Sequence, residues 1–325
     1  MESPTTSSNR TVIVRAPTRI DLGGGWTDVP PYCGELGGFV CNIAISRYAV
    51  ATVAAAETYR GTAVPASSSL DNPLIAAAVR RSGIAGLRVS VASDFPLAAG
   101  LGGSSSASAA VLGALCTWQG RHLNLVEIAE EGRRIEVEDL GISGGRQDHY
   151  AATHGGALAL TFTDRVAVRR LRLSAETRAA FEARALLIYT GESRISGSTV
   201  QAVLDAYRAR ESQVLTALAG MKGLARQMAD ALETGDLDWL GDLLAEHWGF
   251  QRSLHPAIST ARIDEIVMRA QSAGAIGWKA MGASGGGCVL VLAGAGNARE
   301  VRRAIEPLGE ILDFALDPHG LTAQL

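Results

Sequence analysis

The stretch that decides the fold is Pro96-Leu-Ala-Ala-Gly-Leu-Gly-Gly-Ser-Ser-Ser-Ala107, the densest run of glycine and serine in the chain. Small apolar residues follow it as far as Trp118 at helical density, so we expect the loop to open into a buried helix. The glycines let backbone N–H groups converge, the serines add hydroxyls, and the helix adds the positive end of its dipole. This pattern favours a polyphosphate cradle over a simple capped turn. It is neither a Walker A loop nor a dinucleotide fingerprint, because both need a different spacing.

The composition limits what else could hold an anion. The chain has 325 residues, and its 33 acidic and 30 basic side chains give a formal net charge of −3. That balance predicts no nucleic-acid partner and no membrane partner. Only two of the basic residues are lysines, Lys222 and Lys279, whereas there are 37 glycines. We therefore expect any anion site to use arginine, backbone N–H groups or a metal ion.

The N-terminus and the cysteines point to a cytoplasmic protein. Residues 1–10 are rich in Ser and Thr and lack the apolar core of a signal peptide, and no apolar run is long enough to span a bilayer. The four cysteines, Cys33, Cys41, Cys116 and Cys288, have no CxxC spacing. We therefore expect reduced thiols rather than a zinc site or disulfides, and a cytoplasmic location.

Patterning along the rest of the chain predicts alternating strands and helices. The predicted strands are Thr11–Ala16, Gly38–Ala56 (as one or two strands), Leu87–Ser93, Gly155–Phe162, Ala185–Thr190, Cys288–Leu292 and Glu310–Ala315. The predicted helices, besides the one after the loop, are Pro73–Ser82, a helix from Leu125 to near Gly141, a long region Thr199–Trp248 broken near Gly235, Ile263–Ala273 and Ala298–Pro307. The dense motifs stop between about residues 165 and 185, where we expect a domain boundary.

A second cluster, Arg19-Ile-Asp-Leu-Gly-Gly-Gly-Trp-Thr-Asp28, combines a guanidinium, two carboxylates and an indole in a flexible turn. Such a set suits a sugar, because hydroxyls bind carboxylates and the C–H faces of the ring stack on an aromatic side chain. A capped turn with an Arg–Asp pair is an equally open alternative.

A third set consists of Glu136 and the segment Gly144-Gly-Arg-Gln-Asp-His149. Glu136 lies near the apolar face of its predicted helix, so its carboxylate must be paired or bound to a metal ion. Asp148 follows a Gly-Gly turn and is a candidate general base. His149 and His154 are interpreted as core or surface histidines, because no third metal ligand has suitable spacing.

A last glycine cluster, Gly282-Ala-Ser-Gly-Gly-Gly-Cys288, precedes an apolar strand. Consecutive glycines allow another part of the structure to come close, and we expect the nucleotide or the backbone of the first domain to lie against them. Lys279 stands just before the cluster and could reach a phosphate, although the default expectation for it is a solvated lysine.

Together and in this order, these motifs resemble those of the GHMP kinase superfamily over nearly the whole chain. The resemblance implies an α+β, two-domain GHMP kinase fold with the active site between the domains. Residues 1–175 would form a ribosomal protein S5 domain 2-like N-terminal domain, and residues 176–325 a ferredoxin-like C-terminal domain. It also implies an enzyme that uses ATP and Mg²⁺ as cofactors.

The resemblance also implies roles for individual residues. Ser104 would ligate Mg²⁺, with Ser105 as a register alternative, and Glu136 would be the second ligand. Asp148 would take the proton from the attacking hydroxyl, and Arg19 would stabilise the transferring phosphoryl group. The residues expected to bind ATP are Pro96, Ala99, Gly100, Leu101, Gly102, Gly103, Ser104, Ser105 and Ser106. Those expected to bind the substrate are Gly25, Trp26, Thr27, Asp28, Arg194, Gly285 and Gly286.

The first motif narrows the expected substrate. Galactokinases usually carry Gly-Glu-His-Thr-Asp where this chain has Gly24-Gly-Trp-Thr-Asp28, which argues against galactose. The motif is similar to that of the branch containing D-glycero-D-manno-heptose 7-phosphate kinases and L-fucose kinases. This implies phosphorylation of the anomeric hydroxyl of a small-molecule sugar or sugar phosphate, with heptose 7-phosphate preferred and fucose or another sugar as the alternative.

Three further points stay open at this level. A non-catalytic regulator that binds sugar and ATP is a second alternative, disfavoured because Asp148, Glu136 and Ser104 are all present. A 7-phosphate would need cations, for which Arg146, Arg194 and Lys279 are candidates. A homodimer is an open alternative to a monomer.

Overall fold

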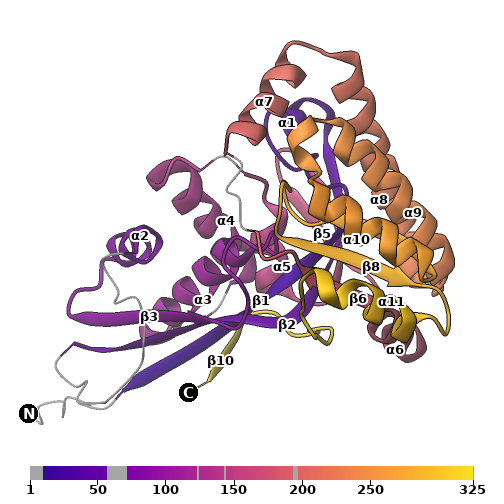
Figure 1. The fold of residues 1–325 in the computed structure, drawn as a ribbon. Helices are drawn as coiled ribbons and strands as arrows, with labels where there is room; N and C mark the ends of the chain where they lie inside the picture. The colour runs from indigo at the N-terminus through magenta and orange to yellow at the C-terminus, as the bar shows by residue number, and fades with distance from the viewer. Residues whose placement is uncertain (1–9, 57–71, 123, 143, 193–196, 325) are drawn as a thin grey trace, which may run out of the picture.

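The computed structural model describes residues 10–56, 72–122, 124–142, 144–192 and 197–324, which form two sheets with helices packed on them (Figure 1). The first sheet has six strands, in the order β10-β1-β2-β4-β5 with β3 paired to β2. The second has four strands in the order β7-β8-β6-β9. Neighbouring strands are antiparallel in both sheets, and the helices lie between and beside them, so the expected α+β architecture is confirmed.

The strands of the first sheet are β1 (Thr11–Gly23), β2 (Gly38–Ala55), β3 (Leu87–Ser93), β4 (Ala157–Phe162), β5 (Val166–Arg170) and β10 (Thr322–Gln324). β2 is one continuous strand, which decides between the one or two strands expected there. β1 runs further than the predicted Thr11–Ala16, because its ladder with β2 continues through the pairs Arg19–Ala44 and Asp21–Asn42. The strand therefore carries two ionised side chains into the centre of the molecule.

The helices of the first half are α1 (Tyr32–Leu36), α2 (Pro73–Ser82), α3 (Gly103–Trp118), α4 (Leu125–Arg134), the π-helix η1 (Ile135–Asp139) and α5 (Gln147–His154). α3 is apolar nearly all round and is buried for most of its length, as the sequence pattern predicts. α2 and α4 begin at Asn72 and Asn124, whose side chains accept backbone N–H groups of the first turn. α5 was not predicted, since the Gly-Gly-Arg-Gln sequence before it suggests only a turn.

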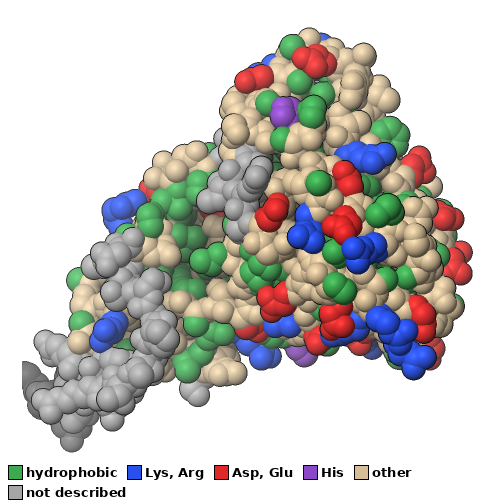
Figure 2. Space-filling view, in the orientation of Figure 1, with side chains coloured by type: hydrophobic (Ala, Val, Ile, Leu, Met, Phe, Trp, Pro, Cys, Tyr) green, Lys and Arg blue, Asp and Glu red, His purple; other side chains and the backbone are tan. Residues whose placement is uncertain are grey.

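The second half contains β6 (Ala185–Tyr189), β7 (Ala275–Ala280), β8 (Cys288–Ala293) and β9 (Glu310–Ile311). Its helices are α6 (Ala175–Arg184), α7 (Gly197–Arg208), α8 (Ser212–Thr234), α9 (Leu237–Ser253), η2 (Pro256–Ile258), α10 (Ala261–Ser272), α11 (Ala298–Ile305) and η3 (Glu306–Leu308). The break at Gly235 is where the sequence places it, in a left-handed conformation. A second break at Arg210, also at positive φ, was missed. On the face seen in Figure 2, acidic and basic side chains alternate over this half.

The predicted last strand Glu310–Ala315 is wrong in extent. β9 is only two residues long, and the final strand is β10, which pairs with β1 through Ile13–Gln324 and its neighbours. The chain therefore returns to the first sheet after building the second. The division into residues 1–175 and 176–325 stays a prediction.

The segment between β1 and β2 reaches across to the helices of the second half (Figure 1). The Tyr32 and Tyr207 rings are 5.6 Å apart, edge to face, and the Tyr207 hydroxyl donates to Glu35 at 2.9 Å. Lys222 of α8 donates to the carbonyl of Leu36 at 3.0 Å. The two halves therefore share one packed interface beside the glycine-rich turn. No helix in the described part of the chain has the length and apolar character needed to cross a bilayer.

Candidate active site

Arg19 lies where β1 passes under the glycine–serine loop. Its backbone N–H donates to the carbonyl of Leu101 at 3.1 Å, and its Nη1 donates to the carbonyl of Gly100 at 2.6 Å. Its Nη2 lies 2.7 Å from Oδ1 of Asp148. The Arg19 side chain is 4% exposed and that of Asp148 26% exposed, so the carboxylate forms the open end of a buried ion pair. One guanidinium therefore joins the loop to the candidate base.

Asp148 also touches the loop directly. A Cβ built on Gly102 would lie 3.0 Å from the carboxylate carbon of Asp148, and Gly102 has a φ of +76°. Only glycine combines that backbone conformation with such a close approach. Burial raises the pKa of Asp148 above its usual value, while the charge of Arg19 opposes that rise. A carboxylate with a raised pKa beside a phosphate loop is suited to accept a proton.

The three serines of the loop have different surroundings. Ser104 is exposed, whereas Ser105 and Ser106 are buried. The Ser105 hydroxyl donates to Oε1 of Glu136 at 3.1 Å, and the Ser106 hydroxyl donates to the carbonyl of Pro17 at 2.7 Å. Ser106 thus fastens the loop to β1, and its predicted contact with ATP stays a prediction. Ser104 is the one exposed serine of the three and its hydroxyl also hydrogen-bonds Glu136, consistent with its predicted role as a ligand.

Glu136 lies in the π-helix η1, which follows α4, and its side chain is buried against the serines of the glycine–serine loop. Burial raises its pKa, and hydrogen bonds from Ser104 and Ser105 oppose the rise. Nε2 of His149 is 3.3 Å from Oε2 of Glu136, but burial lowers the pKa of His149 to about 4, so this contact is not a salt bridge at neutral pH. His149 is a core histidine, as expected.

The donors near Glu136 fit a magnesium ion that arrives with a nucleotide. Mg²⁺ is usually held by one or two carboxylates, and the remaining ligands are substrate phosphates and waters. The Ser104 hydroxyl and the Glu136 carboxylate form such a sparse set, and a divalent cation would relieve the cost of burying that carboxylate. No group of three or more His, Cys, Asp or Glu residues in the described ranges could hold a metal ion without further ligands.

Asp28 is used by the protein itself. Its Oδ2 accepts the backbone N–H groups of Arg146 and Gln147 at 2.8 and 3.0 Å, and a side chain at Gly145 would collide with it. Burial raises the pKa of Asp28 to about 6, against these hydrogen bonds. Asp28 therefore fixes the start of α5 and, through it, Asp148. Its predicted contact with sugar stays a prediction for its second oxygen.

Trp26 and Thr27 support the turn. The Thr27 hydroxyl donates to the carbonyl of Gly24 at 2.6 Å and accepts the N–H of Phe39 at 3.1 Å. Trp26 is 8% exposed and belongs to a hydrophobic cluster that includes Met221 of α8. The expectation that its indole offers an open stacking face therefore has no support in its surroundings. A sugar contact by either side chain, or by buried Gly25, stays a prediction.

Lys279 corrects the expectation of a solvated lysine. It is 0% exposed, its Nζ is 3.1 Å from Oδ2 of Asp21, and it donates to the Asp21 carbonyl at 2.7 Å. A lysine so enclosed cannot also serve the predicted role of holding a substrate phosphate. His247 of α9 accepts the N–H of Gly24 at 2.9 Å, so two residues of the second half hold the turn of the first. Sequence reasoning missed both roles, although the scarcity of lysine was a usable signal.

The last glycine cluster, Gly282–Cys288, packs against the glycine–serine loop, as predicted for a close backbone approach. The N–H of Cys288 donates to the carbonyl of Ala99 at 2.8 Å, and a Cβ on Gly100 would lie 2.8 Å from the carbonyl oxygen of Met281. Gly285 and Gly286 are buried nearby, and their contact with substrate stays a prediction. Arg194 lies outside the described residues. All four cysteines are free thiols.

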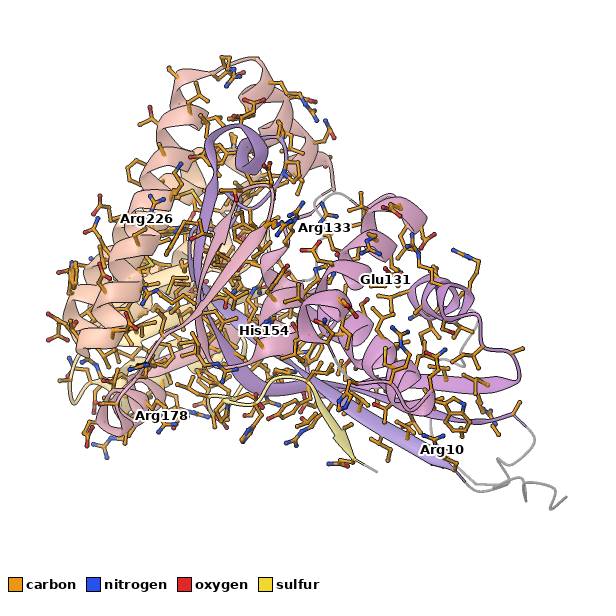
Figure 3. All side chains as sticks on the ribbon, turned by 180° about the vertical axis from the view of Figure 1, so that it is seen from behind. Arg10, Glu131, Arg133, His154, Arg178 and Arg226 are labelled. Atoms are coloured by element: carbon orange, nitrogen blue, oxygen red, sulfur yellow. The ribbon has the colours of Figure 1, made fainter. Side chains whose placement is uncertain are left out.

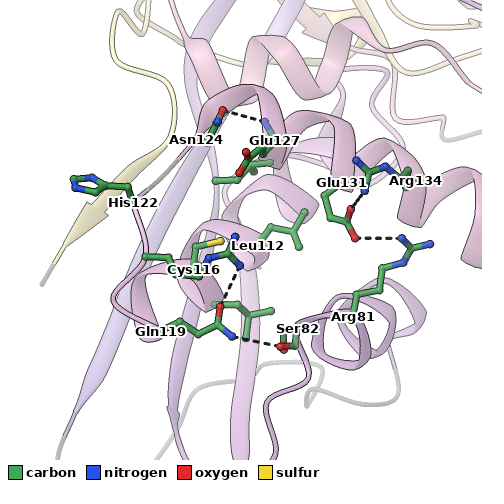
Figure 4. Close-up of a pocket in the computed structure, with 13 residues that line it drawn as sticks. Arg81, Ser82, Leu112, Cys116, Gln119, His122, Asn124, Glu127, Glu131 and Arg134 are labelled. Carbon is green, nitrogen blue, oxygen red and sulfur yellow. Dashed lines mark hydrogen bonds and ion pairs between the residues drawn. The ribbon is translucent and has the colours of Figure 1, made fainter.

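A separate pocket of about 490 Å³ opens between α2, α3 and α4 (Figure 4). It is lined on α3 by residues from Leu112 to Gln119, about 13 Å or more along the helix from Gly103. On its rim, Glu131 joins Arg81 and Arg134 in ion pairs. This pocket is therefore remote from the loop, Arg19 and Asp148.

Two family models match the chain. The GHMP kinases N terminal domain matches residues 72–156, and the GHMP kinases C terminal domain matches residues 228–309, together about half of the chain. The first range holds the loop, Glu136 and Asp148, and the second holds Lys279 and the last glycine cluster. The chain belongs to the GHMP kinase family, and it is accordingly an ATP-dependent kinase.

Individual relatives agree with this family. The chain is 27% identical to a D-glycero-alpha-D-manno-heptose 7-phosphate kinase of Campylobacter jejuni, over 96% of this chain and 98% of that protein. It is also 27% identical to a bifunctional fucokinase/GDP-fucose pyrophosphorylase of Arabidopsis thaliana, but this match covers 91% of the chain and only 31% of that protein. The crystal structure of a D-glycero-D-manno-heptose 1-phosphate kinase from Bacteriodes thetaiotaomicron superimposes with a TM-score of 0.76 at 24% identity, over 97% and 99% of the two chains, which supports the fold.

Proposed function

We propose that this GHMP-family sugar kinase transfers the γ-phosphoryl group of Mg·ATP to the anomeric hydroxyl of D-glycero-D-manno-heptose 7-phosphate. The product would be heptose 1,7-bisphosphate, for the synthesis of nucleotide-activated heptose. The observation that carries the proposal is the contact of Arg19 with both Asp148 and the Gly100 carbonyl. A carboxylate and a guanidinium in contact at the edge of the glycine–serine loop support the assignment of a base and a cation there.

In this mechanism, Asp148 accepts the proton of the anomeric hydroxyl as its oxygen bonds to the γ-phosphorus. The bond between that phosphorus and the β–γ bridging oxygen breaks, and ADP leaves. Arg19 stabilises the charge on the transferring group, and the N–H groups of the loop hold the phosphates. Phosphoryl transfer requires positioning and charge stabilisation more than covalent chemistry, so these residues are sufficient in kind.

Ser104 and Glu136 would hold the magnesium ion, which would neutralise charge on the β- and γ-phosphates. The exposure of Ser104 and the burial of Glu136 beside it support this assignment. Ser105 is the register alternative, and its hydroxyl is engaged with Glu136.

Heptose 7-phosphate is preferred because the relative that matches end to end is a heptose 7-phosphate kinase. L-Fucose or another sugar is the alternative, supported by the fucokinase relative. A regulator without catalysis is less well supported, since Asp148 and Arg19 are paired at the loop. A cytoplasmic location and a homodimer stay predictions.

The test is a panel of sugars and sugar phosphates with ATP and Mg²⁺, monitored by ADP release and by the position of the new phosphate. We expect heptose 7-phosphate to give the highest kcat/KM and a 1-phosphate product. Activity on fucose with none on heptose 7-phosphate would replace the preferred acceptor. ATP binding without transfer to any sugar would favour the regulator.

A further inference from the structure

α4 carries arginines on two faces, and the two faces differ in how their charges are matched. On the outer face, Glu131 pairs with Arg134 and with Arg81 of α2 (Figure 4). Arg81 also pairs with Glu138 and Asp139. Arg133 lies on the opposite side, facing the second half of the molecule (Figure 3). Its Nε and Nη1 are buried and have no hydrogen-bond partner among the described residues. The outer charges are neutralised and the inner one is not.

Arg146 is a second cation next to the first. It stands at the start of α5, where its backbone N–H is held by Asp28, and no ion pair to its half-buried side chain occurs in the described ranges. The charge of Arg146 is close enough to affect Arg133. Burial lowers the pKa of the Arg133 guanidinium, and the like charge of Arg146 lowers it further, whereas the charge of Glu136 raises it. Two like charges are thus held near each other without a dedicated counter-ion, which costs stability.

The neighbouring carboxylates of Glu136 and Asp28 attract the charge of Arg133, but neither accepts a hydrogen bond from its buried Nε and Nη1. Oδ2 of Asp28 accepts two backbone N–H groups, and burial raises the pKa of Asp28 to about 6. Glu136 accepts a hydrogen bond from Ser105 and stands where the magnesium ion of the proposed mechanism would bind. An incoming dianion would therefore find two guanidinium groups free to bind it, in the forked geometry that suits phosphate.

The separation between Arg146 and Asp148 is comparable to the length of one sugar. Arg146 is two residues before Asp148, so their Cα atoms are at most about 7 Å apart. Asp148 in turn contacts the phosphate loop at Gly102. A sugar phosphate whose reacting hydroxyl meets Asp148 has to span only this separation for its other end to approach Arg146, and Arg133 is near enough to Arg146 for their charges to interact.

We propose that Arg133 and Arg146 form a subsite for a phosphate group carried by the acceptor sugar. This rests on the proposed function, since it assumes that the acceptor's hydroxyl reacts at Asp148. The subsite gives specificity for a phosphorylated over an unphosphorylated sugar. The sequence suggested Arg146, Arg194 and Lys279 as cations for such a phosphate. The proposed subsite retains Arg146, does not include Lys279 and contains Arg133 in addition.

The kinetic test compares Arg133→Met and Arg146→Met with the matched control Arg134→Met, one residue away on the outer face. Each protein is assayed with D-glycero-D-manno-heptose 7-phosphate and with the same heptose lacking phosphate. A lost charged hydrogen bond is worth about 10- to 100-fold in affinity. We therefore expect KM for the phosphorylated sugar to rise about 10- to 100-fold in each inner variant. KM for ATP, kcat/KM for the unphosphorylated sugar and the Arg134→Met control should change less than about threefold by the same reasoning.

Two outcomes overturn the subsite. If KM for ATP rises as much as KM for the sugar phosphate, the arginines hold the nucleotide. If neither KM changes in the double variant Arg133→Met/Arg146→Met, they bind no substrate anion.

A binding measurement separates the subsite from the proposed function. Inorganic phosphate, added to wild type saturated with a non-hydrolysable ATP analogue, should raise Tm by about 2–4 °C, and the double variant should lose this response. An unchanged response in the double variant refutes the subsite even if the kinase reaction is as proposed. If the wild type phosphorylates no sugar, the proposed function fails, and the phosphate response still decides the subsite.

Discussion

Two buried cation–carboxylate pairs start from the same strand, two residues apart, and have opposite surroundings. Arg19 pairs with Asp148, whose side chain is 26% exposed, whereas Asp21 pairs with Lys279, and that pair is sealed at 4% and 0%. The first pair ends at the phosphate loop and the second ends at β7 of the second half. In the proposed mechanism the open pair exchanges a proton with the substrate, whereas the sealed pair holds the chain and balances charge.

The two pairs are also electrically linked. Burial alone would raise the pKa of Asp21, but the charges of Lys279 and Arg19 hold it below its usual value. Nε of Arg19 and Oδ1 of Asp21 each lack a hydrogen-bond partner in the described part of the chain. Arg19 and Asp21 share one face of β1, since side chains alternate along a strand. Lys279 therefore pairs with Asp21 through Oδ2 and leaves Arg19 to Asp148.

The largest effect should come from the open pair. Asp148→Asn keeps the shape of the side chain and removes its ability to accept a proton, so kcat should fall about 10³-fold, within the usual range for general-base removal. Nucleotide affinity, measured by titration with an ATP analogue, should stay within about threefold of wild type. A kcat close to that of wild type would remove Asp148 from the role of base.

The next effect tests whether the sealed pair serves the open one. Lys279→Met leaves Asp21 unpaired beside Arg19, and a diverted guanidinium should lower kcat about 100-fold. In Asp21→Asn/Lys279→Met both charges are gone, so Arg19 should stay with Asp148 and kcat should largely recover. Steady-state kinetics and crystal structures of both variants would measure this.

The control for that experiment is the other lysine. Lys222 also joins the second half to backbone carbonyls of the first, at Leu36 and Gly37, but pairs with no carboxylate of the described residues. Lys222→Met should leave kcat unchanged. If the double variant is as inactive as the single one, Lys279 acts only as a clamp between the halves and the electrical link is wrong.

A smaller effect is expected at the serines beside the open pair. Ser104→Ala should raise the Mg²⁺ concentration needed for half-maximal activity about tenfold, with little change in KM for the sugar. Ser106→Ala removes a hydroxyl that donates to Pro17, so it should lower stability by about 1 kcal/mol with an unaltered Mg²⁺ requirement. A larger Mg²⁺ effect for Ser105→Ala than for Ser104→Ala would shift the register of the loop.

The smallest expected effect is a change of stability with pH at His247, which interacts with the sealed pair of Asp21 and Lys279. Burial lowers the pKa of His247 to about 3, whereas an unfolded histidine titrates near pH 6.5. The unfolded chain thus binds the extra proton first, so this stabilisation is complete above about pH 6.5 and is lost as the pH falls toward 3. Between about pH 7 and 5, His247 should account for about 2 kcal/mol of lost unfolding free energy.

Urea unfolding of His247→Gln at those two pH values measures that contribution, because glutamine can still accept the Gly24 N–H. Its loss of stability on acidification should be smaller than that of wild type. Exposed His122→Gln is the control and should retain the full loss. Equal losses in His247→Gln and wild type would contradict the assignment.

Local patterns were sufficient for much of the fold. Pro73–Ser82 and Leu87–Ser93 were predicted to the residue, because their apolar spacing and flanking Asn and Gly signals are local. α5 was missed because Gly144–Arg146 suggests a turn, and what starts that helix is Asp28, 118 residues away. β10 was missed because a strand of three residues is too short to show the alternation of apolar and polar side chains that predicts a strand.

The candidate site likewise consists of residues that local sequence patterns identify and residues that they do not. The glycine–serine loop could be identified as a candidate phosphate site because its glycines and serines are consecutive in the sequence. The burial of Lys279 and of Trp26 could not, since each depends on a partner from the other half of the chain. Arg133 was missed for a related reason: its neighbour Arg134 looks identical in sequence, and only the surroundings of α4 distinguish them.

The return of β10 to β1 has a consequence for how the protein is made. A ribosome would release Thr322–Gln324 only after every residue of the second sheet, yet these residues flank the strand that carries Arg19. Until then, β1 keeps an unpaired edge, and unpaired edges are the places where nascent chains associate wrongly. The strand that carries Arg19 is thus synthesised before the second sheet and is among the last strands to be enclosed. Ligand binding should therefore appear late in synthesis.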